Sequence, residues 1–215
     1  MSAPGTSLDG RIPALLNKAA EWQLLARLFE CPSSEWDADI RRLAADIGDD
    51  DICAAAAAAG KTATEGQYHS VFGPGGPAPP REASYRETLE LGSLMSELAV
   101  YYDAFGYVPV SGEAPDHIAI EVGFVAYLTL KEAYALATGD AERAALAADA
   151  GARFRTEHLA KVAAPLAALL ANSHLEYLAL ASRVLASRVG PAPRSARLPM
   201  APTAESEDDS FECGT

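Results

Sequence analysis

The chain has few cysteines and few basic residues, and each shortage excludes a class of protein. The three cysteines, Cys31, Cys53 and Cys213, include no Cys-x-x-Cys pair. Neither a disulfide framework nor a structural zinc site is expected, and a reducing compartment is the natural location. Lys and Arg number 17 against 30 Asp and Glu, so the net charge is −13. Nucleic acid is not an expected partner, because phosphate binding requires clustered positive charge.

Long apolar runs and strand patterns are also missing. No stretch of about 18 uncharged apolar residues occurs, which predicts no membrane span and no stable membrane insertion. The first ten residues contain no basic region followed by an apolar run, so no secretory signal peptide is expected. The one alternating run, 107–110, contains a proline, which disfavours a central strand. These features predict an all-α protein that stays in the cytoplasm.

Apolar residues recur at helical spacing through most of the chain, which predicts about nine helices. The expected helices are 12–31, a segment capped by Ser33 or Ser34 that carries Trp36, a segment through 54–59 ending near Gly60, a short helix with Tyr68 and Phe72, and then 84–105, 115–137, 141–157, 159–171 and 173–188. Residues 106–114 are the expected hinge between an N-terminal lobe, 12–105, and a C-terminal lobe, 115–189. Residues 190–215, rich in proline and then acidic, are expected to be a disordered tail.

Three ionisable side chains stand together between the hinge and the most apolar helix. Asp116, His117 and Glu121 fall at the expected start of the helix 115–137, where Pro115 fits the first turn and an acid fits the positive helix end. His117 and Glu121 are one turn apart and share a face. Buried ionisable groups are costly. The cluster therefore indicates either a structural ion pair or a functional site.

The motifs of common catalytic and metal sites are absent from the sequence. None of the four histidines has a Glu three residues before it, which argues against a di-iron bundle. The chain contains no His-Glu-x-x-His, no Gly-x-Ser-x-Gly and no Gly-x-x-x-x-Gly-Lys. A small helical metal-dependent enzyme using Asp116, His117 and Glu121 stays open as an alternative, without a motif to support it. We expect no catalytic residue, no bound metal and no cofactor.

Three separated blocks are typical of one protein family. The first runs from Tyr68 through Phe72 and Gly73 to a Gly/Pro loop, Pro80-Arg-Glu and Tyr85; the second is 113–121; the third is Phe154-x-x-x-His158-Leu159. With these blocks, residues 15–188 resemble the TorD/DmsD/NarJ family of redox-enzyme maturation chaperones. The Pro-Arg-Glu variant is most similar to chaperones of type II dimethyl-sulfoxide-reductase-family enzymes. The chain departs from the family in having Glu121-Val-Gly-Phe-Val after the Asp-His pair.

The resemblance implies an all-α chaperone that is not an enzyme. Such a protein binds the apo catalytic subunit of a molybdopterin oxidoreductase, often through its twin-arginine signal peptide, and delays export until the cofactor is inserted. An adaptor that binds only the mature client is the alternative within the family. The resemblance also implies a monomer or a dimer that exchanges helices at the 106–114 hinge.

The expected client-binding surface follows from this resemblance and from the chemistry of the leader. Carboxylates match guanidinium groups, and an apolar groove suits a helical apolar segment. The expected binding residues are Glu113, Pro115, Asp116, His117, Glu121, Tyr68, Phe72, Gly73 and Tyr85. Phe72, Tyr85 and the apolar hinge residues are expected to line the groove, and the net negative charge would speed encounter with a basic peptide.

Overall fold

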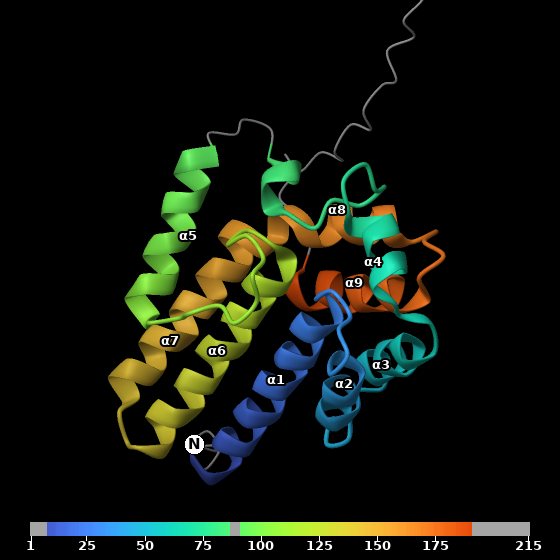
Figure 1. The fold of residues 1–215 in the computed structure, drawn as a ribbon. Helices are drawn as coiled ribbons and strands as arrows, with labels where there is room; N and C mark the ends of the chain where they lie inside the picture. Colours follow the sequence, from blue (N-terminus) through green and yellow to red (C-terminus); the bar gives the residue numbers. More distant parts are fainter. Residues whose placement is uncertain (1–7, 87–90, 191–215) are drawn as a thin grey trace, which may run out of the picture.

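The computed structural model describes residues 8–86 and 91–190, and this part of the chain is all-α, as predicted (Figure 1). Its only β feature is an isolated antiparallel bridge between Arg81 and His117. The helices are α1 (Leu8–Leu28), α2 (Trp36–Ala44), α3 (Asp50–Thr62), α4 (Glu65–Phe72), α5 (Leu91–Phe105), α6 (Ile118–Ala137), α7 (Ala141–Phe154), α8 (Ala160–Leu170) and α9 (Glu176–Val189), with a 3-10 turn η1 (Glu82–Tyr85) and a π-helical turn η2 (Arg155–Leu159).

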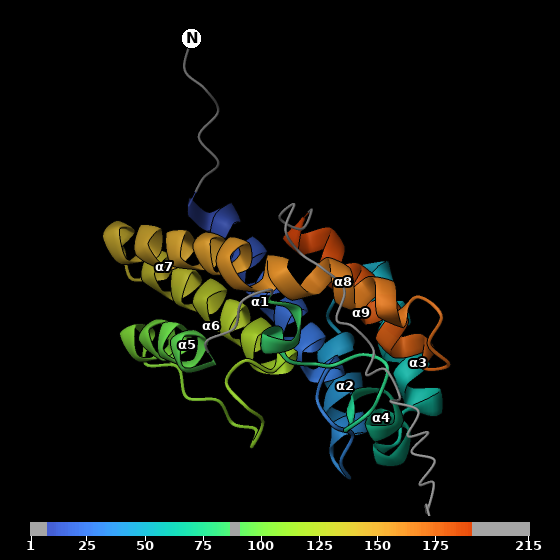
Figure 2. The same cartoon turned by 90° about the horizontal axis from the view of Figure 1, so that it is seen from above.

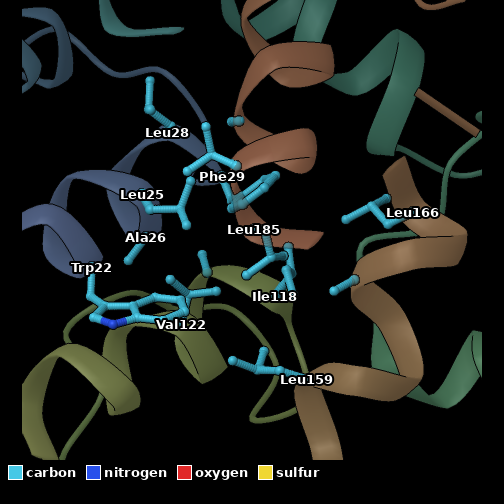
Figure 3. Packing of buried hydrophobic residues seen from close by; sticks show 14 of the residues in the cluster. Trp22, Leu25, Ala26, Leu28, Phe29, Ile118, Val122, Leu159, Leu166 and Leu185 are labelled. Atoms are coloured by element: carbon cyan, nitrogen blue, oxygen red, sulfur yellow. The ribbon is translucent and has the colours of Figure 1, made fainter. Parts of the chain in front are cut away.

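The centre of the molecule is the contact between α1 and α6. Helix α6 is apolar nearly all round, and the sequence pattern correctly places it inside the core. Figure 3 shows side chains of α1, α6, η2, α8 and α9 meeting in one cluster. The labelled side chains are Trp22, Leu25, Ala26, Leu28, Phe29, Ile118, Val122, Leu159, Leu166 and Leu185. Each large apolar side chain that is fully buried contributes about 1.5–3 kcal/mol to the driving force for folding.

The helices form two groups on either side of α1. Helices α5, α6 and α7 lie side by side next to α1, whereas α2, α3, α4, α8 and α9 lie on its other side (Figures 1 and 2). One connected cluster of buried hydrophobic residues includes side chains from before and after the 106–114 segment. A division into two lobes that move about this segment stays a prediction.

Two predicted helix starts, those of α2 and α6, are wrong. Helix α2 has Glu35 at its N-cap, without a side-chain cap, because the serines form a turn in which the Trp36 N–H donates to the Ser33 carbonyl at 3.2 Å. Helix α3, for which the sequence predicted no start, begins at Asp50, because the Asp49 carboxylate accepts from the N–H groups of Asp51 and Ile52. The N-cap of α6 is His117, so Pro115 and Asp116 precede that helix.

Two predicted helices are each divided in the structure. The segment expected as one helix over 84–105 consists of η1 and α5, and residues 87–90 between them lie outside the described part. The helix expected over 141–157 ends at Phe154, where the π-helical turn η2 leads directly into α8. The predicted tail, with Cys213, falls outside the described residues. Across 8–86 and 91–190, every helix is too short or too polar to cross a membrane.

Candidate functional site

The site is built where the segment before η1 crosses the segment before α6. The Ile118 N–H donates to the Pro80 carbonyl at 2.8 Å, and the Glu82 N–H donates to the Asp116 carbonyl at 2.9 Å. These bonds form the bridge between Arg81 and His117. They use backbone groups that a helix would otherwise employ, which is why α6 begins only at Ile118. The first and second sequence blocks are thereby joined.

Asp116 is fully buried, and its charge is neutralised within the chain. Both the Nε and the Nη2 atoms of Arg81 lie 2.8 Å from its Oδ1 atom. The Ala83 N–H donates to Oδ2 at 3.3 Å. A buried carboxylate needs such partners. In this conformation an arginine from another molecule would have to displace Arg81 in order to pair with Asp116.

His117 is buried as a neutral side chain with a defined tautomer. Its Nδ1 atom accepts from the Ala119 N–H at 3.2 Å, so the proton sits on Nε2. Nε2 lies 3.2 Å from the Tyr68 hydroxyl, which donates to the Phe29 carbonyl at 3.1 Å. Burial lowers the pKa of His117 despite the negative charge of Glu113, whose Oε2 is 4.0 Å from Nε2. Burial likewise raises the pKa of Tyr68, so both groups stay neutral.

A second buried carboxylate connects the third sequence block to the other two. Glu82 Oε1 lies 2.7 Å from Arg86 Nε, and Glu82 Oε2 lies 3.0 Å from His158 Nδ1. Burial by itself would raise the pKa of Glu82, but the hydrogen bond and charge of His158 and the charge of Arg86 outweigh it and lower that pKa. Glu82 is therefore an ionised group that ties η1 to η2.

Glu121 is fully buried, and among the described residues neither of its carboxylate oxygens has a hydrogen-bond partner. Burial raises its pKa well above the usual value, and the negative charges of Glu82 and Asp116 raise it further. The buried site therefore favours the neutral carboxylic acid over the carboxylate. The side chain does not face solvent and offers no charge to a ligand in this conformation.

A pocket of about 420 Å³ lies beside this network, and five of the nine predicted binding residues line it. These are Tyr68, Phe72, Gly73, Glu113 and His117. The pocket is completed by the Gly/Pro loop and by three further side chains, His69, Arg81 and Ser84. Arg81 is contained in the first block, but nothing in the sequence pattern singled out His69 or Ser84.

The other four predicted residues do not line the pocket. Asp116 and Glu121 are buried in the network, and Pro115 is exposed on the surface. Tyr85 is buried and donates from its hydroxyl to the Pro79 carbonyl at 2.7 Å, so it braces the Gly/Pro loop. A direct role for these four side chains in client binding stays a prediction.

Gly73 is required by a close approach of the backbone. A Cβ atom at this position would lie 2.4 Å from the His69 carbonyl oxygen. The loop then folds back on α4, with the Ala78 N–H donating to the Val71 carbonyl at 3.3 Å. The glycine therefore lets the wall of the pocket pack tightly against the end of α4.

A larger groove of about 890 Å³ lies between α1, α6 and the first part of the hinge. Its apolar lining includes Leu16 of α1, Leu130 of α6 and the hinge residues Tyr107, Val108 and Val110. Val108 is 80% exposed and Val110 is fully exposed. The sequence predicted that apolar hinge residues line a groove, but it did not predict that side chains of α1 and α6 form the rest of the lining.

The side chains that could share a metal ion differ from those of the enzyme alternative. In the described part of the chain, the group that comes close enough is Cys31, Glu65 and His69, whose ligand atoms all lie within 4.8 Å of one another. Asp116, His117 and Glu121 are not gathered in this way. Asp116 and His117 are bonded to other groups of the chain, namely Arg81, Tyr68 and the Ala119 N–H.

Comparison with known proteins agrees with this convergence of the three blocks. A family model described as nitrate reductase delta subunit matches residues 30–168, well over half of the chain and all three blocks. The comparison with curated proteins and the comparison with solved structures each gave no match. The resemblance noted in the sequence is confirmed by the family match, and the family is one of redox-enzyme maturation chaperones rather than of enzymes. The chain therefore belongs to the nitrate reductase delta subunit family.

Proposed function

We propose that this protein is a cytoplasmic chaperone for the apo catalytic subunit of a molybdopterin oxidoreductase, and that it also binds the twin-arginine leader of that subunit. Binding would hold back export until the cofactor has been inserted. The observation that carries this proposal is the position of residues 106–117. The first part of this segment lines the apolar groove. Two residues of its later part, Glu113 and His117, line the smaller pocket.

The pocket offers a carboxylate to an arginine side chain. Glu113 keeps 39% of its side chain exposed, and within the described residues the one basic group within 4.0 Å of it is the imidazole of His117, which is neutral. Its charge is thus available, unlike that of Asp116. Phe72 and Tyr68 also line this pocket, with most of each side chain buried.

The groove suits the segment of a leader that follows its arginines. That segment is apolar and forms a helix readily, and such helices bind in apolar grooves through side chains spaced one turn apart. The exposed apolar residues Leu16, Val108 and Leu130 face such a partner from three separate segments. A peptide lying along the hinge would place its arginines at Glu113 and its apolar part in the groove.

The test is a binding titration of a client leader peptide with wild-type protein and with Glu113→Gln. Loss of a half-exposed ion pair is worth up to about 1 kcal/mol, so we expect about fivefold weaker binding. Glu142→Gln is the matched control, because Glu142 is an exposed glutamate on α7 that lines neither the groove nor the pocket. It should bind as the wild type does.

A leaderless client distinguishes the adaptor alternative. If the mature subunit without its leader binds as tightly as the full precursor, and Glu113→Gln changes nothing, the protein is an adaptor and the leader proposal is wrong. Co-purification of the client from the native host, identified by mass spectrometry, would name the enzyme. Substitution of Asp116 is unsuited to this test, because it removes a buried partner of Arg81.

A further inference from the structure

Three potential metal ligands meet between the end of α1 and the outer face of α4. Cys31 follows α1, and Glu65 and His69 are one turn apart on α4. The Sγ atom of Cys31 lies 3.7 Å from the Nε2 atom of His69. The Oε1 atom of Glu65 lies 3.9 Å from the same nitrogen. All three ligand atoms fall within 4.8 Å of one another.

We infer that Cys31, Glu65 and His69 form a binding site for a divalent transition metal, with zinc as the best match. Thiolate, imidazole and carboxylate are all common zinc ligands. With bond lengths of about 2.3 Å to sulfur and about 2.1 Å to nitrogen, a tetrahedral ion separates the two ligand atoms by about 3.6 Å. The observed sulfur–nitrogen distance of 3.7 Å is close to that value. Nitrogen and oxygen would be about 3.4 Å apart on such an ion, compared with the observed 3.9 Å, so Glu65 must move closer to bind it.

The surrounding structure holds these ligands in place and leaves them accessible. Thr64 caps α4 by accepting from the Gln67 N–H, which fixes the first turn of the helix that carries Glu65. The side chains of His69 and Glu65 are 54% and 74% exposed, so an ion can enter without any opening of the core. Three protein ligands leave a fourth position for water or for a group of another molecule.

Cys53 shows what a cysteine without such neighbours does in this fold. Its Sγ atom contacts the Ile47 carbonyl at 3.4 Å, and it belongs to no group of candidate ligands in the described chain. Cys31 differs because a histidine and a carboxylate converge on it. Cys31 therefore has the neighbours of a metal ligand, whereas the contact of Cys53 is a structural one.

The proposed metal site adjoins the pocket of about 420 Å³ that Glu113 and His117 line, but it does not depend on the proposed function. His69 is a ligand in one and a wall residue in the other. A bound ion would therefore place positive charge at the edge of the pocket, close to Glu113. The sequence predicted no metal site, because Cys31 and the pair on α4 are far apart along the chain.

Cobalt(II) titration of the metal-free full chain tests the site. In a Cys53→Ser/Cys213→Ser background, Cys31 is the only thiol of the chain. We expect a sulfur-to-cobalt charge-transfer band that saturates at one equivalent and disappears when zinc is added. Cys31→Ser should abolish the band, and His69→Gln should weaken binding at least tenfold. His174→Gln, which alters another exposed histidine, is the control and should bind as the background does.

Two outcomes would overturn the site. One is the absence of a saturable band in the Cys53→Ser/Cys213→Ser protein. The other is a His69→Gln titration identical to that of the background. Circular dichroism of each variant checks that the helices are intact, and His69→Gln alters an exposed side chain, so loss of the fold does not confuse the result. Neither outcome bears on leader binding, which is measured separately.

Discussion

The carboxylate of Asp116 and the guanidinium group of Arg81 form one of the contacts that hold the loop before η1 to the start of α6. Asp116 is completely buried, whereas 42% of the Arg81 side chain is exposed. We predict that Arg81→Ala lowers the free energy of unfolding by about 1–3 kcal/mol, because it leaves a buried carboxylate without its charged partner. Chemical denaturation measures this loss.

A double-mutant cycle with Asp116→Asn separates the pair from the rest of the site. If the two groups stabilise the fold through each other, the coupling free energy should reach about 1 kcal/mol or more. The Arg81→Ala/Asp116→Asn protein should then be closer in stability to the single variants than their sum implies. Additive losses would show that Arg81 does not stabilise Asp116, and the carboxylate would be free for another partner.

Glu121 predicts an unusual pH dependence. Its pKa is raised in the folded chain, so between the unfolded value near 4.5 and the folded value the folded state holds more protons than the unfolded state. Its contribution is fully present below the unfolded value and is lost as pH rises through the folded value, by about 1.4 kcal/mol per pH unit inside that window. Glu121→Gln removes this slope, so the variant should gain stability relative to the wild type as pH rises from about 5.

Denaturant titrations of both proteins at a series of pH values provide the measurement. The decisive quantity is the difference between the two unfolding free energies, because other titrating groups cancel in it. A difference that stays constant from about pH 5 to 8 would mean that Glu121 is ionised in the native state with an ordinary pKa. Glu142→Gln, on the surface, should show no such slope.

At the scale of elements, aromatic rings connect α5 to α6 and α7. Phe124 of α6 is fully buried, and its ring centroid lies 4.9 Å from that of Tyr102, 5.2 Å from that of Tyr107 and 4.8 Å from that of Phe154. Tyr102 belongs to α5, Tyr107 to the hinge and Phe154 to α7. One side chain therefore connects three segments, and the aromatic pairs add about 0.5–1.5 kcal/mol each.

Phe124→Ala should lower the free energy of unfolding by about 3–5 kcal/mol. Because the lost contacts are those of α5 and the hinge, hydrogen exchange should accelerate most at residues 91–110. Leu166→Ala, a buried α8 side chain in the central cluster, is the matched control and should destabilise the chain without that local effect. Equal acceleration in both variants would show that α5 is held by other contacts.

The sequence predicts a helix well where the spacing of apolar residues and the turn residues within that segment determine its position. Helix α6 is correctly placed because its apolar residues surround the axis, and its C-terminal end at Ala137 precedes Gly139, which has a positive φ of 77°. The start of α6 is wrong because backbone groups of Asp116 and Ile118 bond to a segment about 35 residues earlier. No local pattern reports such a partner. The π-helical turn η2 is likewise invisible in the apolar spacing.

At the scale of the whole molecule, the candidate site is partly predictable. The three blocks could be recognised as motifs, and the structure brings all three together around Glu82, Asp116 and His158. The burial of Asp116 and Glu121 was expected from the apolar helix that follows them, but the groups around them were not predictable, because these depend on how η1 and η2 pack on α6. The group formed by Cys31 and His69 joins residues that only the packing of α1 against α4 brings together.

The net charge of −13 is a property of the whole chain and predicts a kinetic effect on leader binding. A negatively charged surface speeds the encounter with a basic peptide, and salt screens this attraction, since the Debye length falls from about 10 Å at 0.1 M to about 3 Å at 1 M. On the proposed function, the association rate constant for a twin-arginine leader should fall roughly tenfold between low and high salt. Stopped-flow fluorescence with a labelled leader measures it.

The matched control is a leader in which both arginines are replaced by glutamine. If the field of the chain acts on these two charges, the control should associate slowly at all salt concentrations and show little dependence on salt. The dissociation rate constant of the wild-type leader should change less than its association rate constant, because the apolar groove contacts are not screened. An association rate constant that is independent of salt would mean that the acidic surface serves solubility and that Glu113 acts only after contact.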